Sequence, residues 1–595
     1  MDLITDSRAL MIVRQLLDNT SATRAVFEQA PQKPKFVPSA IQKPFERVSP
    51  ESQGIPSAHI AAFLNEMRDD PTLDMHGVIV LKNGKIIAQA AFGAYDQNVW
   101  HITHSECKSV TGLAVGMLVG EGKLSPDDKL VDVFADRMNR IGTLTHRGIT
   151  IRHLLTMTSG IAFNEAGSVT ETDWVKCFLE SAVLREPGTT FNYNSMNTYM
   201  LACAIRQVTG QSLTEYLRPR LFEPLGIENF FWEKCPKGNE KGGWGLYILP
   251  EDIAKIGQMV LDGGVFEGRR IVPEEWISEA TRAQMQTPAS LGDYDYGYQI
   301  WVGRGERSFL FNGMFGQNVM GFFDSGVLLV TNAGNNELFQ QSSYYALARK
   351  YFGGTIPAAG PKQSRADTNA LESAKARLRE DLFMPETKLF GDLFAGKGKL
   401  NLAEICRRLD GRAYFAAEDK RAASIGVFPL YAQTLQNNFV KGLHAISFLY
   451  RDGVLQVVID ETDERHVLNV GFGEPAYGEV TTHGETHRVG VSGRFAPDES
   501  GAPVLTMRIS FLEAANARLI KIRFFDGRIE SEWSESPGKG YLTDALASVK
   551  EQNALIGGVL GRTDEELLLF RIARILEPKV VLSERGSGSG SVAKK

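Results

Sequence analysis

The stretch HITHSECKSVTGLAVGMLVGEGKL, residues 101–124, carries a serine and a lysine three positions apart at the start of a long apolar run. Residues three apart lie on one face of a helix, so Ser105 and Lys108 have a hydroxyl and an amine within hydrogen-bond reach. The side chains that follow are apolar nearly all round, which predicts a buried helix. A buried lysine is costly unless something uses it. The stretch therefore predicts a nucleophilic serine activated by a lysine that its surroundings keep neutral.

The four residues from Ser105 to Lys108 also fit a simpler interpretation. A serine often caps the N-terminus of a helix, and a lysine in the first turn often extends into solvent. Short matches of this kind arise by chance in a chain of 595 residues. The apolar helix favours the buried lysine, and the decision between the two readings depends on the rest of the chain.

Composition places the chain among soluble globular proteins, with 43% hydrophobic and 23% charged residues. A length of 595 residues predicts three or four structural units. The net charge of −6 argues against a nucleic-acid partner, because there is no basic surplus to neutralise phosphates. No stretch is long enough for a membrane span, and residues 1–20 lack the pattern of a signal peptide. We therefore expect a cytoplasmic protein with no membrane partner.

The five cysteines are widely spaced and form no C-x-x-C pair, which argues against zinc ribbons and redox motifs. We expect them to be reduced thiols. Four histidines around and after the serine match no metal-ligand spacing and are expected to be core or capping residues: His101, His104, His146 and His153. The sequence thus predicts no metal site and no cofactor.

Strand patterns lie at both ends of the segment that contains Ser105. Residues 76–93 predict a hairpin around Asn83-Gly84, the strongest short hairpin signal. Further strand patterns lie at 296–302, 307–323 and 326–334, and mostly helical sequence fills the middle. This order predicts an α+β fold with an antiparallel sheet flanked by helices and an all-helical subdomain.

The remainder of the chain has a different character. Short alternating runs separated by turn dipeptides such as Asp452-Gly453 and Asp526-Gly527 predict a C-terminal all-β domain, a small barrel or sandwich. The expected organisation is an N-terminal arm (1–45), a catalytic domain (46–355), a charged helical linker (356–410), the all-β domain (411–583) and a flexible Gly/Ser-rich tail (584–595).

A second chemical feature is Tyr193, which follows the turn at Pro187-Gly188 and precedes an amphipathic helix that begins near Met196. Loops on a rigid scaffold are where catalytic groups concentrate. The alternative interpretation of Tyr193 is an aromatic packing residue. The sequence around it leaves both interpretations open.

The order of these motifs resembles the serine β-lactamase-like superfamily. Its S-x-x-K motif matches Ser105 to Lys108, and the stretches 149–161, 193–195 and 245–264 follow in the family's order. The resemblance covers about residues 45–350 and includes class C β-lactamases, family VIII carboxylesterases, D-aminopeptidases and 6-aminohexanoate-dimer hydrolases. It implies a β-lactamase-like fold and a serine hydrolase that cleaves ester or amide bonds through an acyl-enzyme on Ser105, with no cofactor.

The resemblance also implies roles for single residues. Ser105 would be the acylated nucleophile, Lys108 would accept its proton, and Tyr193 would relay protons to the leaving group and the deacylating water. The backbone amides of Ser105 and Met314 would form the oxyanion hole. Ser195 stands where the family often has asparagine, and would hydrogen-bond Lys108 or the substrate.

The chain departs from the family at Phe311-Asn312-Gly313, where members usually carry Lys-Thr-Gly or His-Thr-Gly. Gly313 keeps the close backbone approach, and Asn312 and Gly313 are expected to border the substrate. The cation that helps bind a substrate carboxylate is missing. This difference puts β-lactam hydrolysis and peptidoglycan carboxypeptidation in doubt and favours neutral ester or amide substrates. The pattern GxxGQ at 313–317 is similar to that of 6-aminohexanoate-dimer hydrolases.

Two other functions stay open on this resemblance. An acyltransferase would use an alcohol or amine in place of water. A non-catalytic penicillin-binding-like or sensor protein is favoured by Phe311 and Ser195. The all-β domain resembles the lipocalin-like appendages that follow such catalytic domains, which implies that it gates access or supports a homodimer. The expected partner is a small-molecule ester or amide substrate.

Overall fold

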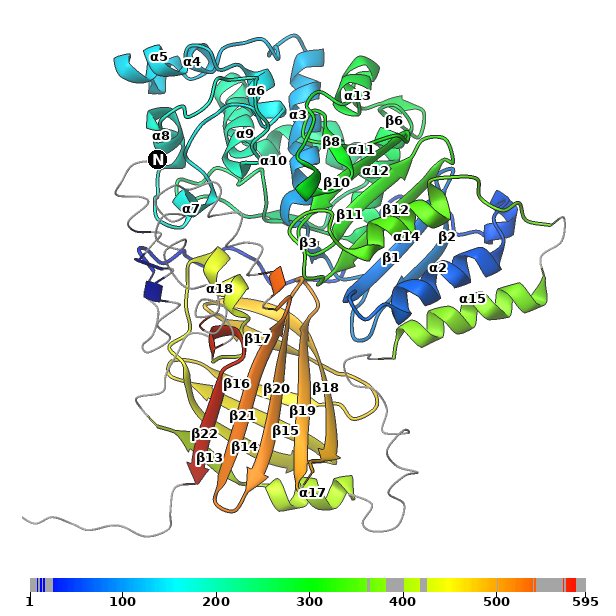
Figure 1. Cartoon of the computed structure of the whole chain (residues 1–595), viewed down its shortest axis with the longest axis vertical. Helices are drawn as coiled ribbons and strands as arrows, with labels where there is room; N and C mark the ends of the chain where they lie inside the picture. Colours follow the sequence, from blue (N-terminus) through cyan, green and yellow to red (C-terminus); the bar gives the residue numbers. More distant parts are fainter. Residues whose placement is uncertain are drawn as a thin grey trace, which may run out of the picture.

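The computed structural model describes residues 25–360, 364–380, 401–417, 425–499, 501–538, 540–541 and 574–584, together with residues 8, 11, 12, 14, 15 and 571. Most of the first 24 residues of the expected arm, residues 361–363 and 381–400 of the expected linker, and residues 585–595 of the expected tail lie outside the described residues. The described chain forms an α+β domain and an all-β domain that lie against each other (Figure 1).

The α+β domain is built on a seven-stranded antiparallel sheet with the order β2-β1-β12-β11-β10-β9-β8. Its strands are β1 (Met75–Lys82), β2 (Lys85–Ala91), β8 (Tyr294–Tyr296), β9 (Trp301–Gly303), β10 (Ser308–Gly313), β11 (Gln317–Phe322) and β12 (Val327–Ala333). β1 pairs with β12, so strands from both ends of the domain share one sheet. This confirms the predicted fold class.

Helices cover both faces of this sheet (Figure 1). On one face lie α2 (Ser57–Asp69), α14 (Ser343–Phe352) and α15 (Arg365–Leu378), which share one apolar core. On the other face lie α3 (Cys107–Gly120) and α12 (Pro250–Leu261), within a second core. α15 falls in the stretch expected to be a linker, and it packs along α2, where the Arg68 guanidinium donates to the Arg377 carbonyl at 2.9 Å.

A mostly helical region separates α3 from α12 in the sequence. Its helices are α4 (Leu130–Val133), α5 (Arg140–His146), α6 (Ile151–Leu155), α7 (Glu165–Ser168), α8 (Trp174–Glu180), α9 (Ser195–Thr209), α10 (Leu213–Leu217) and α11 (Glu223–Leu225). After α12, the short strands β6 (Val265–Phe266) and β7 (Arg269–Arg270) and the helix α13 (Glu274–Ala280) lead back to the sheet. The buried side chains of α9 belong to the same core as α3, so this region covers the helix that follows Ser105.

The all-β domain is a ten-stranded antiparallel sheet with the order β16-β15-β14-β13-β22-β21-β20-β19-β18-β17. Its strands are β13 (Ala413–Ala416), β14 (Leu443–Arg451), β15 (Val454–Glu461), β16 (Arg465–Val470), β17 (Ala476–Thr482), β18 (Glu485–Pro497), β19 (Pro503–Phe511), β20 (Ala517–Phe525), β21 (Arg528–Ser536) and β22 (Lys579–Glu584). The sheet curls into a near-barrel accompanied by α17 (Leu402–Leu409) and α18 (Leu430–Gln436), as Figure 1 shows. The predicted C-terminal all-β domain is confirmed.

Buried polar contacts join the two domains. Arg508 of β19 donates to both carboxylate oxygens of Asp74 at 2.9 Å. Glu513 of the barrel accepts the indole N–H of Trp100 at 2.6 Å and pairs with Lys33 of the N-terminal arm at 2.9 Å. The hydrogen bond between Trp100 and Glu513 thus attaches the barrel to the segment just before Ser105. Among the residues that the structure describes, no helix combines the length and apolar character needed to cross a bilayer.

Candidate active site

Ser105 lies in a short turn between a strand and a buried helix. The strand β3 (His101–Ile102) pairs with β5 (Leu246–Ile248), which also pairs with β4 (Phe230–Trp232). The 3-10 turn His104–Glu106 then leads directly into α3. His104 has φ 46°, a left-handed conformation that a non-glycine residue adopts at a cost. The sharp turn leaves Ser105 partly exposed while both its neighbours are buried.

Lys108 is in contact with the serine hydroxyl. Its Nζ lies 2.8 Å from Ser105 Oγ and donates to the Gly243 carbonyl oxygen at 2.7 Å. Burial lowers the pKa of Lys108 from its ordinary value of 10.5 to about 8, opposed by the nearby Cys107 and Glu165. Because a large fraction of an amine with this pKa is neutral in mildly alkaline solution, Lys108 can accept the serine proton.

Tyr193 borders the same amine. Lys108 Nζ lies 5.0 Å from the centre of the Tyr193 ring. The ring is stacked on Trp301 and meets Phe339 edge-on, with centroid distances of 5.8 and 5.1 Å. Burial raises the pKa of Tyr193 well above its ordinary value, and a hydrogen bond with Ser105 opposes this rise. The phenol is therefore protonated near neutral pH, so it can donate a proton towards the Ser105 hydroxyl.

The end of β10 lies against the nucleophile turn. A Cβ atom built on Gly313 would lie 2.2 Å from the Thr103 carbonyl oxygen and 3.1 Å from the Glu106 nitrogen. Only glycine permits this approach. Met314, the next residue, is partly exposed like Ser105. The sheet therefore brings the backbone of the expected oxyanion residue Met314 beside the Ser105 turn.

The Asn312 side chain, expected to border the substrate, points to the other side of the sheet. The Asn312 side chain donates to Asn318 at 2.9 Å and to the Tyr345 hydroxyl at 3.0 Å, and it accepts from Gln340 at 3.0 Å. These partners lie on the α14 side of the sheet, so the structure does not bring the Asn312 side chain to Ser105.

Ser195 begins α9, and its backbone N–H donates to Glu165 Oε1 at 2.6 Å. A Cβ atom on Gly243 would lie 3.0 Å from the Ser195 carbonyl oxygen and 3.4 Å from its Cβ. Ser195 thus packs against the loop whose carbonyl binds Lys108, and Gly243 leaves the room for that packing.

The resemblance implies a cation at position 311 in relatives, and this chain has Phe311 there. The Phe311 side chain is fully buried. It lies in the core that contains α3, with its ring 5.4 Å from Phe309. No charge therefore enters the site from this strand position.

The four histidines considered in the sequence do not converge. His146 Nδ1 is bonded to the Gly142 carbonyl at 3.1 Å, and His153 Nδ1 accepts the Thr150 N–H in a helix cap at 3.2 Å. His101 contacts His76 at 3.2 Å. His104 is packed edge-on against Phe315. All four are parts of caps or packing contacts.

Sequence reasoning missed three groups at the site. The Gly243 carbonyl leaves no side-chain signal. Glu165 of α7 influences Lys108, Tyr193 and Tyr431 electrostatically, but it stands in a stretch without a motif. Tyr431 comes from α18 of the other domain.

Tyr431 contacts residues on both sides of Ser105. Its hydroxyl lies 3.0 Å from the Met314 sulfur. Its ring meets Phe315 edge-on at 5.1 Å and lies 6.2 Å from the His104 ring. The barrel thus contributes an aromatic side chain to the surroundings of Ser105.

Comparison with known proteins agrees with this geometry. Residues 58–348 match the family model described as Beta-lactamase. The 6-aminohexanoate-dimer hydrolase of Paenarthrobacter ureafaciens is 26% identical over 271 residues, which are 40% of this chain and 68% of that protein. Protein flp of Staphylococcus aureus (strain MW2) is 30% identical over 170 residues, 26% of this chain and 33% of that protein.

The match to a solved family VIII carboxylesterase covers 56% of this chain and 98% of the carboxylesterase chain, with a TM-score of 0.40 and 16% sequence identity. The family match spans both the sheet and the helix that carries Ser105 and Lys108. The α+β domain of this chain belongs to the beta-lactamase family.

Proposed function

We propose that this protein is a serine hydrolase that cleaves ester or amide bonds of small molecules through an acyl-enzyme on Ser105. The observation that carries the proposal is the 2.8 Å contact between Ser105 Oγ and the Nζ of a buried Lys108 whose pKa is lowered to about 8. A hydroxyl beside a partly neutral amine is the arrangement of an activated nucleophile.

The proposed reaction has two steps. Lys108 takes the proton of Ser105 as its oxygen attacks the carbonyl carbon, and this proton passes through Tyr193 to the leaving alcohol or amine. Water then attacks the acyl-enzyme and gives a proton to the same two groups, which return it to the Ser105 oxygen as the acid leaves. The backbone amides of Ser105 and Met314 would stabilise the oxyanion, a contribution of about 10²–10³ in rate for each donor.

Two features support a neutral substrate. The buried Phe311 supplies no cation for a substrate carboxylate. Glu165, next to Lys108 and Tyr193, adds negative charge to the same surroundings. A carboxylate at the acyl portion of the substrate would meet the negative charge of Glu165 and find no cation at position 311.

The test uses p-nitrophenyl acetate. We expect steady-state turnover by the wild type, loss of at least about 10³-fold in kcat for Ser105→Ala, and an acyl adduct on Ser105 detected by mass spectrometry of peptides after quenching. Unchanged turnover in the folded Ser105→Ala variant contradicts the proposal. A single burst of product without steady-state turnover would instead identify a non-catalytic acyl-binding protein. Esters formed with added alcohols would identify an acyltransferase.

We also propose that the barrel limits the size of the acyl group through Tyr431. The contacts of this side chain with Met314 and His104 support a wall beside the oxyanion strand. Removal of an aromatic side chain from such a wall opens space for additional methylene groups, each worth about 10-fold or more in discrimination.

The measurement is kcat/KM for p-nitrophenyl esters from acetate to octanoate. Tyr431→Ala is expected to raise the octanoate-to-acetate ratio by about tenfold. Tyr477→Ala removes an exposed tyrosine of the same barrel and serves as the matched control. An unchanged ratio in a folded Tyr431→Ala variant would contradict the proposal that Tyr431 limits the size of the acyl group. It would not bear on the proposed hydrolysis through Ser105.

A further inference from the structure

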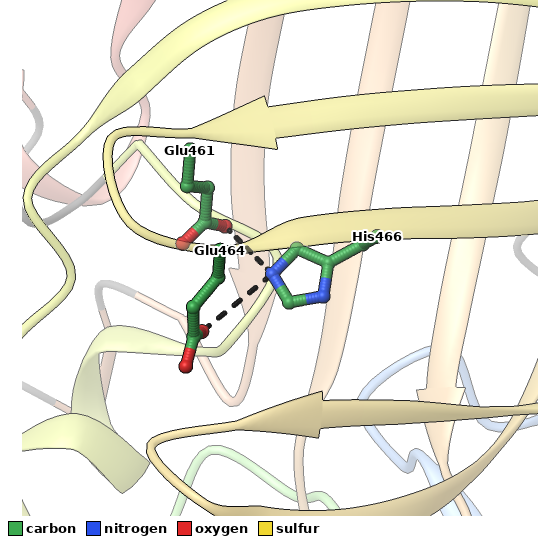
Figure 2. A group of neighbouring side chains, drawn as sticks. All are labelled: Glu461, Glu464 and His466. Atoms are coloured by element: carbon green, nitrogen blue, oxygen red, sulfur yellow. Dashed lines mark ion pairs between the residues drawn. The ribbon is translucent and has the colours of Figure 1, made fainter.

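A second cluster of ionisable side chains lies in the barrel, on the hairpin formed by β15 and β16. Glu461 ends β15, Glu464 lies in the turn and His466 is the second residue of β16. The backbone N–H of Glu461 donates to the Glu464 carbonyl at 2.8 Å, which closes the turn. Figure 2 shows the two carboxylates directed towards one ring nitrogen of His466. The cluster is separate from Ser105, and the proposed acyl chemistry does not use it.

The spacing of these atoms fits metal ligands better than hydrogen bonds. His466 Nε2 lies 3.5 Å from Glu461 Oε1 and 3.7 Å from Glu464 Oε2. Good hydrogen bonds are shorter. Two ligands of a tetrahedral zinc ion, each 2.0–2.2 Å from the metal, are about 3.4 Å apart. One ligand atom from each residue lies within 4.8 Å of the others, so only small adjustments are needed.

Burial makes the Glu461 carboxylate difficult to explain without a cation. Its side chain is 0% exposed, and Oε2 finds no hydrogen-bond partner among the described residues. The nearby Arg518 is itself paired with Glu535 at 3.1 Å. Glu461 and Glu464 thus place two carboxylates beside one imidazole, and the buried Oε2 of Glu461 is open to a further ligand contact. A divalent cation would supply that contact.

Neighbouring groups hold the carboxylates in place. Glu461 Oε1 accepts the Val427 N–H at 2.7 Å, and Glu464 Oε2 accepts the Thr482 hydroxyl at 2.8 Å. The backbone N–H of His483 donates to Glu464 Oε1 at 2.5 Å. Such outer hydrogen bonds orient carboxylate ligands at metal sites. A Cβ on Gly426 would lie 3.0 Å from Glu461 Oε1, so glycine lets this segment approach the carboxylate.

We propose that Glu461, Glu464 and His466 bind a divalent transition-metal ion, with Zn²⁺ as the species that this mixed imidazole and carboxylate set favours. Glu464 is 20% exposed on its side chain, so water can reach a fourth position. The ion would hold the β15–β16 turn together, and the hydrogen bonds of its two carboxylates would tie that turn to the β17–β18 turn and to residues 425–430. That segment leads into α18, so the site stabilises the barrel on the side that carries Tyr431.

The experiment uses the full chain, stripped with a chelator and then supplied with Zn²⁺. Elemental analysis after gel filtration should find about one zinc per chain, and Tm should rise by about 3 °C or more. His466→Gln and Glu464→Gln should lose both effects. His444→Gln and Glu479→Gln change the same residue types on neighbouring strands and should keep them.

Three outcomes overturn the proposal. One is a wild type that binds no stoichiometric zinc and keeps the same Tm, which would mean that His466 and the carboxylates form ion pairs alone. Another is a His466→Gln variant that retains as much zinc as the wild type. The third applies if the variants do not fold. The wild type loaded with Co²⁺ would then lack the visible absorption of four-coordinate cobalt, which rejects the site. None of these results bears on turnover by Ser105.

Discussion

At the level of single residues, the main feature is that Lys108 is enclosed but forms no ion pair with the residues that the structure describes. Its partners are a hydroxyl and a backbone carbonyl, neither of which carries a full charge. With a pKa of about 8, roughly a tenth of Lys108 is neutral at pH 7 and about nine-tenths at pH 9. Since only the neutral amine accepts the Ser105 proton, kcat/KM should rise with pH through about 8 and then level off.

Glu165 tests this assignment, because its negative charge raises the pKa of Lys108. Glu165→Gln keeps an oxygen for the Ser195 N–H but removes the charge. We expect the midpoint of the pH–rate profile to move to lower pH, and kcat/KM at pH 7 to rise by about twofold.

The measurement is kcat/KM for p-nitrophenyl acetate across the pH range, beside the exposed Glu186→Gln as a control. A midpoint that stays in place or moves upward would show that Lys108 is not the titrating base.

The sequence could predict the residues that act through local spacing. Ser105 and Lys108 meet because an i, i+3 pair shares a face, which needs no knowledge of the tertiary fold. Gly243 and Tyr431 could not be predicted, because a backbone carbonyl has no side-chain signature and a residue of another domain has no fixed separation. Asn312 was expected near the substrate with Gly313, but successive residues of a strand face opposite sides of the sheet.

Among the elements, the strand β10 connects the sheet to the Ser105 turn. Gly313 ends this strand and touches the turn that holds Ser105. The obstacles to a side chain there are the Thr103 carbonyl oxygen, the Glu106 nitrogen and the Cβ of Gln317, none of which a rotamer change can move. A methyl group at this position cannot be accommodated by a rotamer change, so the strand and the turn must move apart.

Gly313→Ala should therefore lower kcat for p-nitrophenyl acetate by about 10²-fold or more, because the Met314 amide leaves the oxyanion. Gly148→Ala is the matched control, since a Cβ there has no neighbour within 4 Å. The check is kcat together with far-ultraviolet circular dichroism. A folded Gly313→Ala variant with wild-type kcat would contradict an oxyanion role for the end of β10.

Hairpins were the elements that the sequence predicted most directly. Asn83 and Gly84 have φ of 51° and 72°, and Asp452 and Gly453 have φ of 52° and 81°. Two-residue turns with both φ positive strongly favour Asn-Gly and Asp-Gly, so the dipeptides identify the turns. The position of α15 was harder to predict from the sequence. Its charged composition suggested a linker, and only the packing of its apolar side chains on α2 places it in the first domain.

For the molecule as a whole, the two domains are joined by buried charges as well as by apolar contacts. Lys33 and Glu513 are 0% and 1% exposed, and Glu513 also accepts from Trp100. Removing one partner of a buried ion pair leaves the other without compensation, which costs about 3–5 kcal/mol.

Glu513→Ala is expected to lower the free energy of unfolding by about that amount, 3–5 kcal/mol, in urea titrations followed by fluorescence. Turnover of p-nitrophenyl acetate should be lost at the same lower urea concentration, since Trp100 lies just before the Ser105 turn. Glu479→Ala removes an exposed ion pair between the same arm and barrel, with Lys35, and should cost less than about 1 kcal/mol. Equal effects of the two variants would contradict a structural role for the buried pair.

The hydrogen bond from the Ile102 N–H to the Glu513 carbonyl, 2.9 Å long, has a consequence for domain exchange. The barrel is part of the scaffold that holds the backbone just before Ser105. We therefore expect a chimera that takes another barrel at the domain boundary, without the contacts of Lys33, Trp100 and Glu513, to displace the Ser105 turn.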